Sequence, residues 1–255
     1  MSDYTLSIQN LAIGYRKVIL AQEINFQLKA GALCAIIGRN GIGKSTLLRT
    51  ITQLQPKIAG AIVLKNKTVE DYTPPELSST LSIVLTEPLA TKNLTVLELL
   101  ALGRQPYTNW FGRLTPKDRL QIAAVMEQFD LTALKDRKCY ALSDGQLQKV
   151  WIARAAVQDT PIMVLDEPTT HLDLHHKVEI LKHLRHLATA YQKTILFTTH
   201  DIELALQLCD TLLILDGATN PFGAPKRLID QGCFATLFPP DQIIFDARKG
   251  AFTIR

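Results

Sequence analysis

The feature that most constrains the fold is a glycine-rich run between an apolar segment and a segment with helical spacing. Residues 38–45 read Gly-Arg-Asn-Gly-Ile-Gly-Lys-Ser and match G-x-x-x-x-G-K-S without a mismatch. The apolar run 32–37 precedes them, and the leucine-containing segment 46–51 follows. A short buried strand, a tight turn and a helix are typical of a parallel-sheet α/β protein. The run therefore predicts a phosphate-binding loop between a strand and a helix.

Several residues of this loop have distinct expected roles. Backbone N–H groups can surround phosphates, Lys44 can reach the β and γ oxygens, and the Ser45 hydroxyl can ligate Mg²⁺. A chance match would arise roughly once in a hundred chains of this length. The flanking strand and helix make chance a poor explanation. The residues expected to contact nucleotide here are Gly38, Asn40, Gly41, Gly43, Lys44, Ser45 and Thr46.

Two further apolar runs end at polar residues. Residues 162–165 lead into Asp166 and Glu167, and residues 194–199 lead into His200. Polar groups at the carboxyl ends of parallel strands converge on one crevice. A buried carboxylate is costly unless it meets a cation or hydrogen-bond donors, so we expect Asp166 to hold Mg²⁺ through a water.

The neighbouring residues then suggest catalytic roles. Glu167 could polarise an attacking water, and His200 could touch a γ-phosphate. Alone, an Asp-Glu pair at a strand end is more often a helix cap or a solvated turn, and a lone histidine is usually structural. The phosphate loop upstream is what favours the catalytic interpretation.

Between about residues 87 and 158 the apolar spacing becomes helical, and Thr115 followed by Pro116 resembles an N-cap with proline at the first helical position. We expect a helical subdomain inserted into a core formed by about residues 1–86 and 159–255. All 255 residues would then form one nucleotide-binding domain. A short strand pair, 242–245 and 251–254, is expected near the end of the sequence.

Bulk composition excludes several classes of protein. The net charge is +4, and the basic residues are spread along the sequence, which gives little support for nucleic-acid binding. Four scattered cysteines without C-x-x-C spacing indicate reduced thiols in a cytosolic compartment. We expect no signal peptide and no membrane span, so any work at a membrane requires docking onto another subunit. The five histidines between residues 171 and 186 are better explained as a solvated helix face than as a metal site.

Five ordered motifs resemble those of the ATP-binding cassette (ABC) family. They are the phosphate loop, Leu-Ser-Asp-Gly-Gln at 142–146, the Asp-Glu pair, Thr-His-Leu-Asp at 170–173, and His200. The resemblance covers nearly the whole chain. It implies an α/β fold with a P-loop NTPase core, an inserted α-helical subdomain and an N-terminal antiparallel β region, with ATP and Mg²⁺ as cofactors.

The resemblance also assigns roles to individual residues. It implies that Tyr15 stacks on adenine, that Asp173 lies in a loop contacting the opposite subunit, and that His200 is the switch histidine. Tyr15 could instead be an ordinary core or surface tyrosine.

The run at 142–146 has a physical logic of its own. Ser143 supplies a hydroxyl, and Gly145 and the amides that follow open a helix, expected from Gln146 to residue 158, whose positive end can point at an anion. In the family that anion is the γ-phosphate held by the other subunit. The resemblance therefore implies a head-to-tail homodimer with two composite sites that closes on ATP.

Two positions depart from the family pattern. Asp144 replaces a glycine beside the expected triphosphate, which is tolerable if its side chain turns away or caps the helix. We expect weaker dimerisation as a result. Glu87 stands where the family has a glutamine, and we hypothesise that it is a Mg²⁺ ligand that couples the ATPase to transport.

The segment 94–107 closely resembles the helical lobe of importer ATPases that serve ferric siderophores, haem and cobalamin, as do residues 110–114 and 168–173. This implies two integral-membrane permease subunits, an indirect substrate-binding protein, and a peripheral location on the cytoplasmic face of the inner membrane. A soluble cassette ATPase of iron-sulfur cluster assembly is the alternative. A degenerate nucleotide sensor is disfavoured because Lys44 and Glu167 are retained. The cargo and the permease cannot be determined from these residues.

Overall fold

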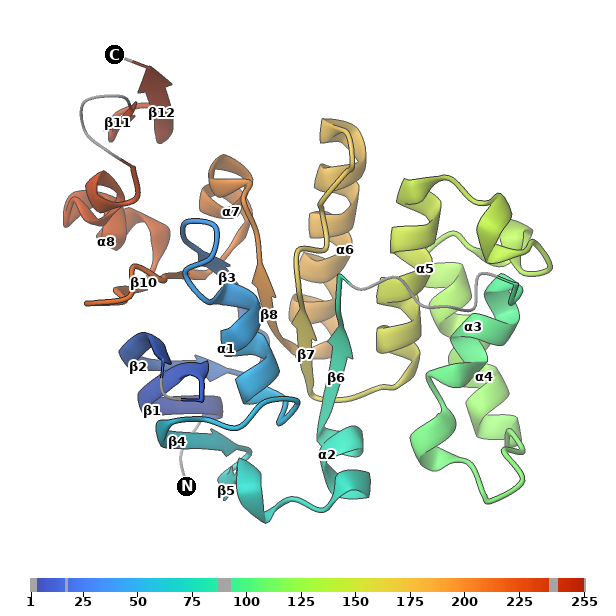
Figure 1. The fold of residues 1–255 in the computed structure, drawn as a ribbon. Coiled ribbons are helices and arrows are strands. Elements are labelled where there is room, and N and C mark those ends of the chain that lie inside the picture. The colour runs from blue at the N-terminus through green and yellow to red at the C-terminus, as the bar shows by residue number, and fades with distance from the viewer. Residues whose placement is uncertain (1–3, 17, 87–92, 239–242, 255) are drawn as a thin grey trace.

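The strand before the phosphate loop lies inside a parallel sheet (Figure 1). The computed structural model describes residues 4–16, 18–86, 93–238 and 243–254. Within them, six strands form the sheet in the order β10-β9-β3-β8-β7-β6, and the short β10 (Phe222–Gly223) pairs antiparallel to β9. The parallel strands are β3 (Leu33–Ile37), β6 (Leu81–Val84), β7 (Ile162–Leu165), β8 (Thr194–Thr198) and β9 (Thr211–Ile214).

The predicted N-terminal antiparallel region is confirmed. The described strands of this second sheet run in the order β2-β1-β4-β5 and pair antiparallel throughout. They are β1 (Tyr4–Tyr15), β2 (Val18–Lys29), β4 (Ala59–Leu64) and β5 (Lys67–Thr68).

Side chains of β3 alternate between two hydrophobic clusters because successive residues of a strand face opposite sides of its sheet. Cys34 and Ile36 pack with helix α1 (Lys44–Ile51) and the antiparallel sheet. Leu33, Ala35 and Ile37 pack with helices on the other face, including α6 (Leu174–Tyr191). Both faces of the parallel sheet are covered, which explains the unbroken apolar run before the phosphate loop.

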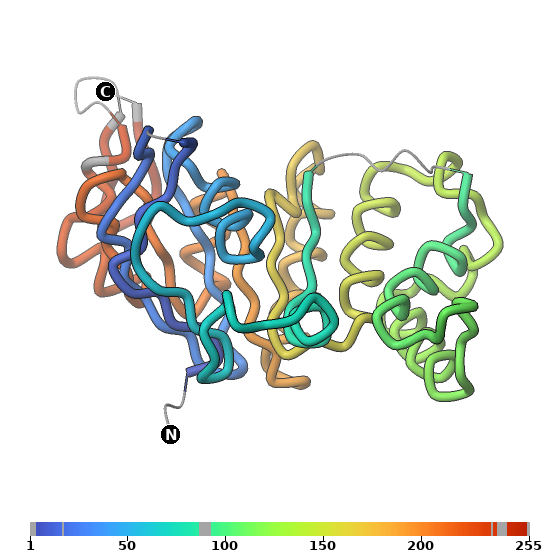
Figure 2. The backbone as a smooth tube through the Cα atoms, turned by 60° about the horizontal axis from the view of Figure 1, so that its bottom comes forward, coloured from blue at the N-terminus to red at the C-terminus, as the bar shows by residue number. Residues whose placement is uncertain are grey.

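The helical subdomain lies between β6 and β7 in the sequence. Figures 1 and 2 show it beside the β6 edge of the sheet. Its described α-helices are α3 (Val96–Leu102), α4 (Pro116–Gln128) and α5 (Asp144–Val157). Thr115 caps α4 as predicted, by accepting a hydrogen bond from the backbone N–H of Asp118. The carboxylate of Asp118 also pairs with Arg104 at 2.8 Å, and both side chains are buried. This ion pair ties the segment after α3 to the start of α4.

The rest of the fold completes the core. Its α-helices are α2 (Pro74–Thr80), α7 (Ile202–Leu208) and α8 (Pro225–Asp230). A hairpin of β11 (Ile243–Asp246) and β12 (Ala251–Ile254) matches the expected strand pair, except that Gln242 lies outside the described residues. Phe245 of this hairpin stacks on Phe234 at 4.6 Å between ring centroids. Among the described helices, none combines the length and apolar character that crossing a bilayer requires.

Short 3₁₀ turns connect these elements. They are η1 (Val69–Asp71), η2 (Gln105–Tyr107), η3 (Thr132–Leu134), η4 (Cys139–Ala141) and η5 (Cys233–Thr236). Three cysteines are buried, and burial raises the pKa of the Cys34 thiol to about 12. Thiols this deeply buried are packing residues.

Candidate nucleotide site

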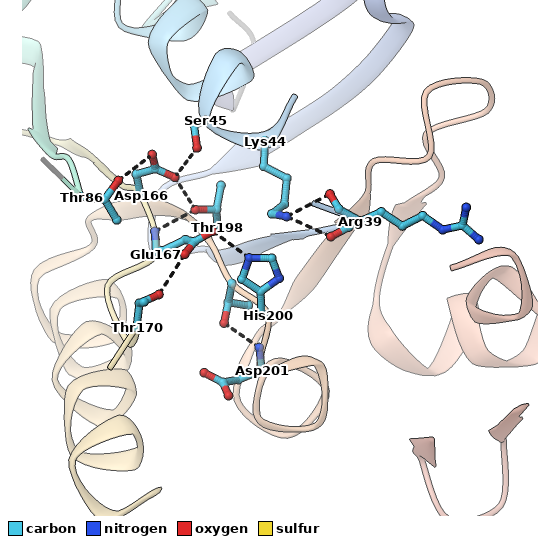
Figure 3. A network of polar contacts seen from close by, with 12 residues as sticks. Arg39, Lys44, Ser45, Thr86, Asp166, Glu167, Thr170, Thr198, His200 and Asp201 are labelled. Carbon is cyan, nitrogen blue, oxygen red and sulfur yellow. Dashed lines mark hydrogen bonds and ion pairs between the residues drawn. The ribbon is translucent and has the colours of Figure 1, made fainter. Parts of the chain in front are cut away.

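The ends of β3, β7 and β8 bring the predicted polar residues into one crevice (Figure 3). The Ser45 hydroxyl, at the start of α1, donates a hydrogen bond to Asp166 at 3.0 Å. Glu167 and His200, which follow β7 and β8, approach to 2.8 Å. The crevice expected from three strand ends therefore exists, and its residues are in direct contact.

The phosphate loop has the backbone shape that its glycines allow. Gly43, the residue that caps α1, has φ of 109°, a left-handed conformation that strains other residues. A β-carbon on Gly38 would lie 2.4 Å from the carbonyl oxygen of Leu215. Glycine is required at these two positions by conformation and by close approach, respectively.

Lys44 lies at the centre of the loop and is buried, with 6% of its surface exposed. Its ammonium donates to the carbonyl oxygens of Gly38 at 2.9 Å and Arg39 at 3.2 Å. Burial lowers the pKa of Lys44, and the nearby charges of Glu167 and Asp166 partly offset this. An anion entering the loop would add favourable charge and compete for the same donor.

A cavity of about 340 Å³ opens above the loop. It is lined by Tyr15, Leu20, Asn40, Gly41, Gly43, Lys44, Ser45, Thr46 and Glu167. The Tyr15 hydroxyl accepts a hydrogen bond from Thr46 at 3.2 Å, and 53% of the Tyr15 surface is exposed. Tyr15 is thus neither a core residue nor remote from the loop. Leu20, on β2, is a lining residue that sequence reasoning missed, since nothing in the pattern of a β-strand marks which apolar residue faces a neighbouring loop.

Asp166 is almost fully buried, at 3% exposure, and its carboxylate is surrounded by hydroxyl groups. Within the described residues it accepts hydrogen bonds from Ser45 at 3.0 Å, Thr198 at 2.7 Å and Thr86 at 3.3 Å. These donors stabilise a carboxylate that would otherwise be costly to bury. The sequence did not indicate either threonine, because threonine is common in strands and β8 contains two of them.

Glu167 is held from several sides. One carboxylate oxygen contacts the Nε2 of His200 at 2.8 Å, and the other accepts from the Thr170 hydroxyl at 2.9 Å. Its backbone N–H donates to the hydroxyl of Thr198 at 2.8 Å, and its φ is 48°. A non-glycine residue in the left-handed region is uncommon and indicates that the surrounding contacts fix the backbone here.

The run at 142–146 forms the start of α5, two residues earlier than the predicted helix at 146–158. Ser143 is the N-cap, and it exchanges hydrogen bonds with Gln146 in a capping box. Asp144 is exposed in the first turn and does not provide the cap. Of the two ways in which this carboxylate could be tolerated, capping of the helix is therefore wrong.

His176 links this run to the loop that contains Asp173. A β-carbon on Gly145 would lie 2.8 Å from Cδ2 of the His176 ring. The other side of the ring contacts both carboxylate oxygens of Asp173 at 2.9 Å through Nδ1, and Asp173 also caps α6. Two motifs that are distant in sequence are thus packed together by a histidine that sequence reasoning assigned to a solvated helix face.

A single chain keeps the run at 142–146 apart from the phosphate loop. No residue of 142–146 lines the described cavity, and Figure 1 shows α5 separated from α1 by β6 and β7. The described residues also contain no cluster of three or more His, Cys, Asp or Glu side chains able to hold a metal ion. Glu87, the other residue expected at the metal, lies outside the described residues.

A family model described as ABC transporter matches residues 21–170, which extend from β2 through the phosphate loop and α5 to the Asp-Glu pair. The chain belongs to the ABC transporter family. An uncharacterized ABC transporter ATP-binding protein of Methanocaldococcus jannaschii is 39% identical, over 98% of this chain and 87% of that protein. The iron(3+)-hydroxamate import ATP-binding protein FhuC of Bacillus subtilis is 35% identical, over 93% of this chain and 85% of that protein.

A solved structure described as an inward-facing ABC transporter of metal-chelate type superposes with a TM-score of 0.81. It is 28% identical in sequence and covers 98% of this chain and 95% of that one. The predicted family, fold class and ATPase activity of this ABC protein are confirmed. Its ATP-binding character is confirmed at the level of the family.

The oxygen donors of this ABC ATPase fit a magnesium ion. Ser45 offers a hydroxyl and Asp166 a carboxylate, and Mg²⁺ is usually held in proteins by one or two carboxylates together with substrate phosphates and waters.

Proposed function

We propose that this ABC ATPase is the energy-coupling subunit of an importer for ferric siderophores or a related iron complex. The hydroxamate-import relative and the metal-chelate type of the similar structure support the substrate class. The proposal includes haem and cobalamin as alternative cargoes, because the segment 94–107 resembles the ATPases of importers that carry them. A soluble ATPase of iron-sulfur cluster assembly is the second candidate.

The proposed reaction is the hydrolysis of ATP with Mg²⁺. The phosphate loop binds the triphosphate, with Lys44 on its β and γ oxygens and Tyr15 against the adenine. Ser45 and Asp166 would hold Mg²⁺, and the charge of the ion would neutralise the phosphates. The cavity shared by Lys44 and Glu167 is the single observation that most supports this reaction.

Glu167 and His200 are the proposed catalytic residues. Glu167 accepts a proton from the attacking water or orients it, and His200 contacts the γ-phosphate. In the described conformation the two side chains contact each other, so the incoming γ-phosphate and water would replace that contact.

The proposed assembly is a homodimer in which Ser143, Gly145 and the loop at Asp173 act on nucleotide held by the partner. This accounts for the separation of the run at 142–146 from the phosphate loop in one chain. The dimer would bind two integral-membrane permease subunits at the cytoplasmic face of the inner membrane, and a substrate-binding protein would act indirectly. Nucleic acid is not a proposed partner.

Two exposed aromatic residues support a protein partner for the helical subdomain. Trp110 and Phe111, in the segment between α3 and α4, are 97% and 80% exposed. Adjacent large apolar side chains in water usually mark an interaction surface. We also propose the division into a core of residues 1–86 and 159–255 and a helical subdomain of residues 87–158, with Glu87 at their junction as a Mg²⁺-dependent coupling residue.

The experiment measures ATP hydrolysis by the Glu167→Gln variant, both as the purified protein and together with its permease. We expect ATP hydrolysis to fall by about 10²- to 10⁴-fold, the usual contribution of a general base. ATP binding should be retained, and ATP should convert the variant into a stable dimer by light scattering. Hydrolysis that is unchanged by this substitution would contradict the catalytic assignment.

Reconstitution separates the two candidate functions. In proteoliposomes with the permease, a ferric siderophore presented by its binding protein should stimulate hydrolysis by the native enzyme. Stable association with a soluble scaffold and none with membranes would favour the second candidate.

A further inference from the structure

The Asp166 carboxylate is oriented by two threonines that come from different elements of the fold. Thr198 is the last residue of β8 and is fully buried, whereas Thr86 lies just after β6 and is exposed. Thr198 donates to Oδ1 of Asp166, and Thr86 donates to Oδ2. The two hydroxyls therefore hold both oxygens of one carboxylate, which fixes the plane of the group (Figure 3).

Thr198 also contacts the backbone of Glu167, the residue that follows Asp166. A hydroxyl has one hydrogen to donate and two lone pairs that accept. The Thr198 hydroxyl uses its hydrogen for Asp166 at 2.7 Å and accepts the backbone N–H of Glu167 at 2.8 Å. One buried hydroxyl thus determines the orientation of the candidate metal carboxylate and the backbone of the candidate catalytic residue.

The third donor to Asp166 has a different function. Ser45 lies in the phosphate loop, and its oxygen is the group that would meet Mg²⁺. Thr198 is not among the residues that line the described cavity, and neither is Thr86. When Ser45 and Asp166 turn their lone pairs to a metal, the threonine contacts can persist.

We propose that Thr198 and Thr86 are positioning residues that hold Asp166 in the orientation required for Mg²⁺ with ATP. Thr198 is the fixed member because it is buried inside the parallel sheet. Thr86 is the adjustable member, since its bond is longer and it lies on the connection from β6 toward α3 of the helical subdomain. The inference rests on the proposed Mg²⁺ and ATP site.

The test compares valine and serine at position 198, because valine keeps the shape of threonine and serine keeps its hydroxyl. The measured quantity is the affinity for a fluorescent ATP analogue with Mg²⁺ and with EDTA. For Thr198→Val we expect the gain in affinity from Mg²⁺ to shrink by about tenfold or more, the usual effect of losing a residue that orients a metal ligand. Affinity in EDTA should stay within about twofold, because Thr198 does not line the cavity.

Matched variants distinguish positioning from simple loss of structure. Thr198→Ser should retain the Mg²⁺ gain. Thr194→Val, at the other end of β8 and equally buried, should behave as the native protein because the described side-chain bonds of Thr194 go to Thr5 and Lys29, away from Asp166. If Thr198→Val fails to fold, Thr86→Val provides the test at an exposed position, with an expected reduction of the Mg²⁺ gain by roughly threefold.

The outcomes separate this inference from the proposed function. Suppose that Mg²⁺ raises the affinity of the native protein for the analogue and raises the affinity of the folded valine variants by the same factor. This result would overturn the positioning role alone. Native protein without any Mg²⁺-dependent binding would overturn both. Manganese in place of magnesium, detected by electron paramagnetic resonance, should give the same order of variants.

Discussion

Gly145 is the residue at which the packing of the run at 142–146 can be tested most directly. A β-carbon there would lie 2.8 Å from Cδ2 and 3.2 Å from Cγ of His176. Favourable carbon contacts lie at about 3.5 to 4.0 Å, so Gly145→Ala requires the ring to retreat by several tenths of an ångström. The ring is restrained on its other side by the carboxylate of Asp173.

Two effects of opposite sign determine how much Gly145→Ala changes the free energy of unfolding. Overpacking of a well-fitted contact costs about 1–3 kcal/mol. Alanine in place of glycine in a helix returns up to about 1 kcal/mol, and less in the first turn, where Gly145 lies. We expect Gly145→Ala to lower the free energy of unfolding by about 1–2 kcal/mol. For a chain of this size that corresponds to a fall in Tm of about 2–8 °C.

The assay is urea unfolding of the native chain, Gly145→Ala, His176→Ala and the double variant. His176→Ala alone should have a small effect because its ring is partly exposed. In its background, Gly145→Ala should become neutral or stabilising, because the ring that opposed the methyl group is absent. An equal cost of Gly145→Ala in both backgrounds would refute the packing argument. If stability returns in the double variant while ATP-induced dimerisation does not, Gly145 also acts on the partner's nucleotide.

Two further substitutions test the helical subdomain and the adenine position. Arg104→Ala should lower the free energy of unfolding by about 3–5 kcal/mol, because it leaves the buried carboxylate of Asp118 without its cation; urea unfolding measures this, and a loss below about 1 kcal/mol would contradict it. Tyr15→Ala should weaken ATP binding by about tenfold if the ring stacks on the base, whereas Tyr15→Phe, which removes only the bond to Thr46, should bind almost normally. Equal ATP affinities for Tyr15→Ala and the native protein in a fluorescence titration would exclude the stacking role.

Local patterns were sufficient to predict the parts of the fold that depend on local physics. The phosphate loop, the buried strands on either side of the Asp-Glu pair and the capped start of α4 all follow from spacing and residue type. The start of α5 was predicted two residues late; the hydroxyl of Ser143 accepts a hydrogen bond from the backbone N–H of Gln146, so the helix begins at Asp144.

The side chains that surround each site residue could not be predicted from local sequence patterns. Thr86 and Thr198 bond to Asp166 from positions 80 and 32 residues away in sequence, and no local pattern indicates that pairing. Sequence reasoning treated His176 as one of several solvated histidines because helical spacing does not show what lies across from a helix.

The sequence by itself determined which chemistry this protein can perform. A lysine and a serine in a glycine-rich turn, and carboxylates at a strand end, predict phosphate and metal binding because these roles depend on functional groups that the turn and the strand hold in place. Only the tertiary structure decided how those groups are oriented. The hydroxyl of Thr198 meets Asp166, and the ring of His176 meets Gly145, through contacts between elements that adjoin only after the sheet and the helical subdomain have assembled. Such contacts depend on strand order and helix packing, which are properties of the whole chain.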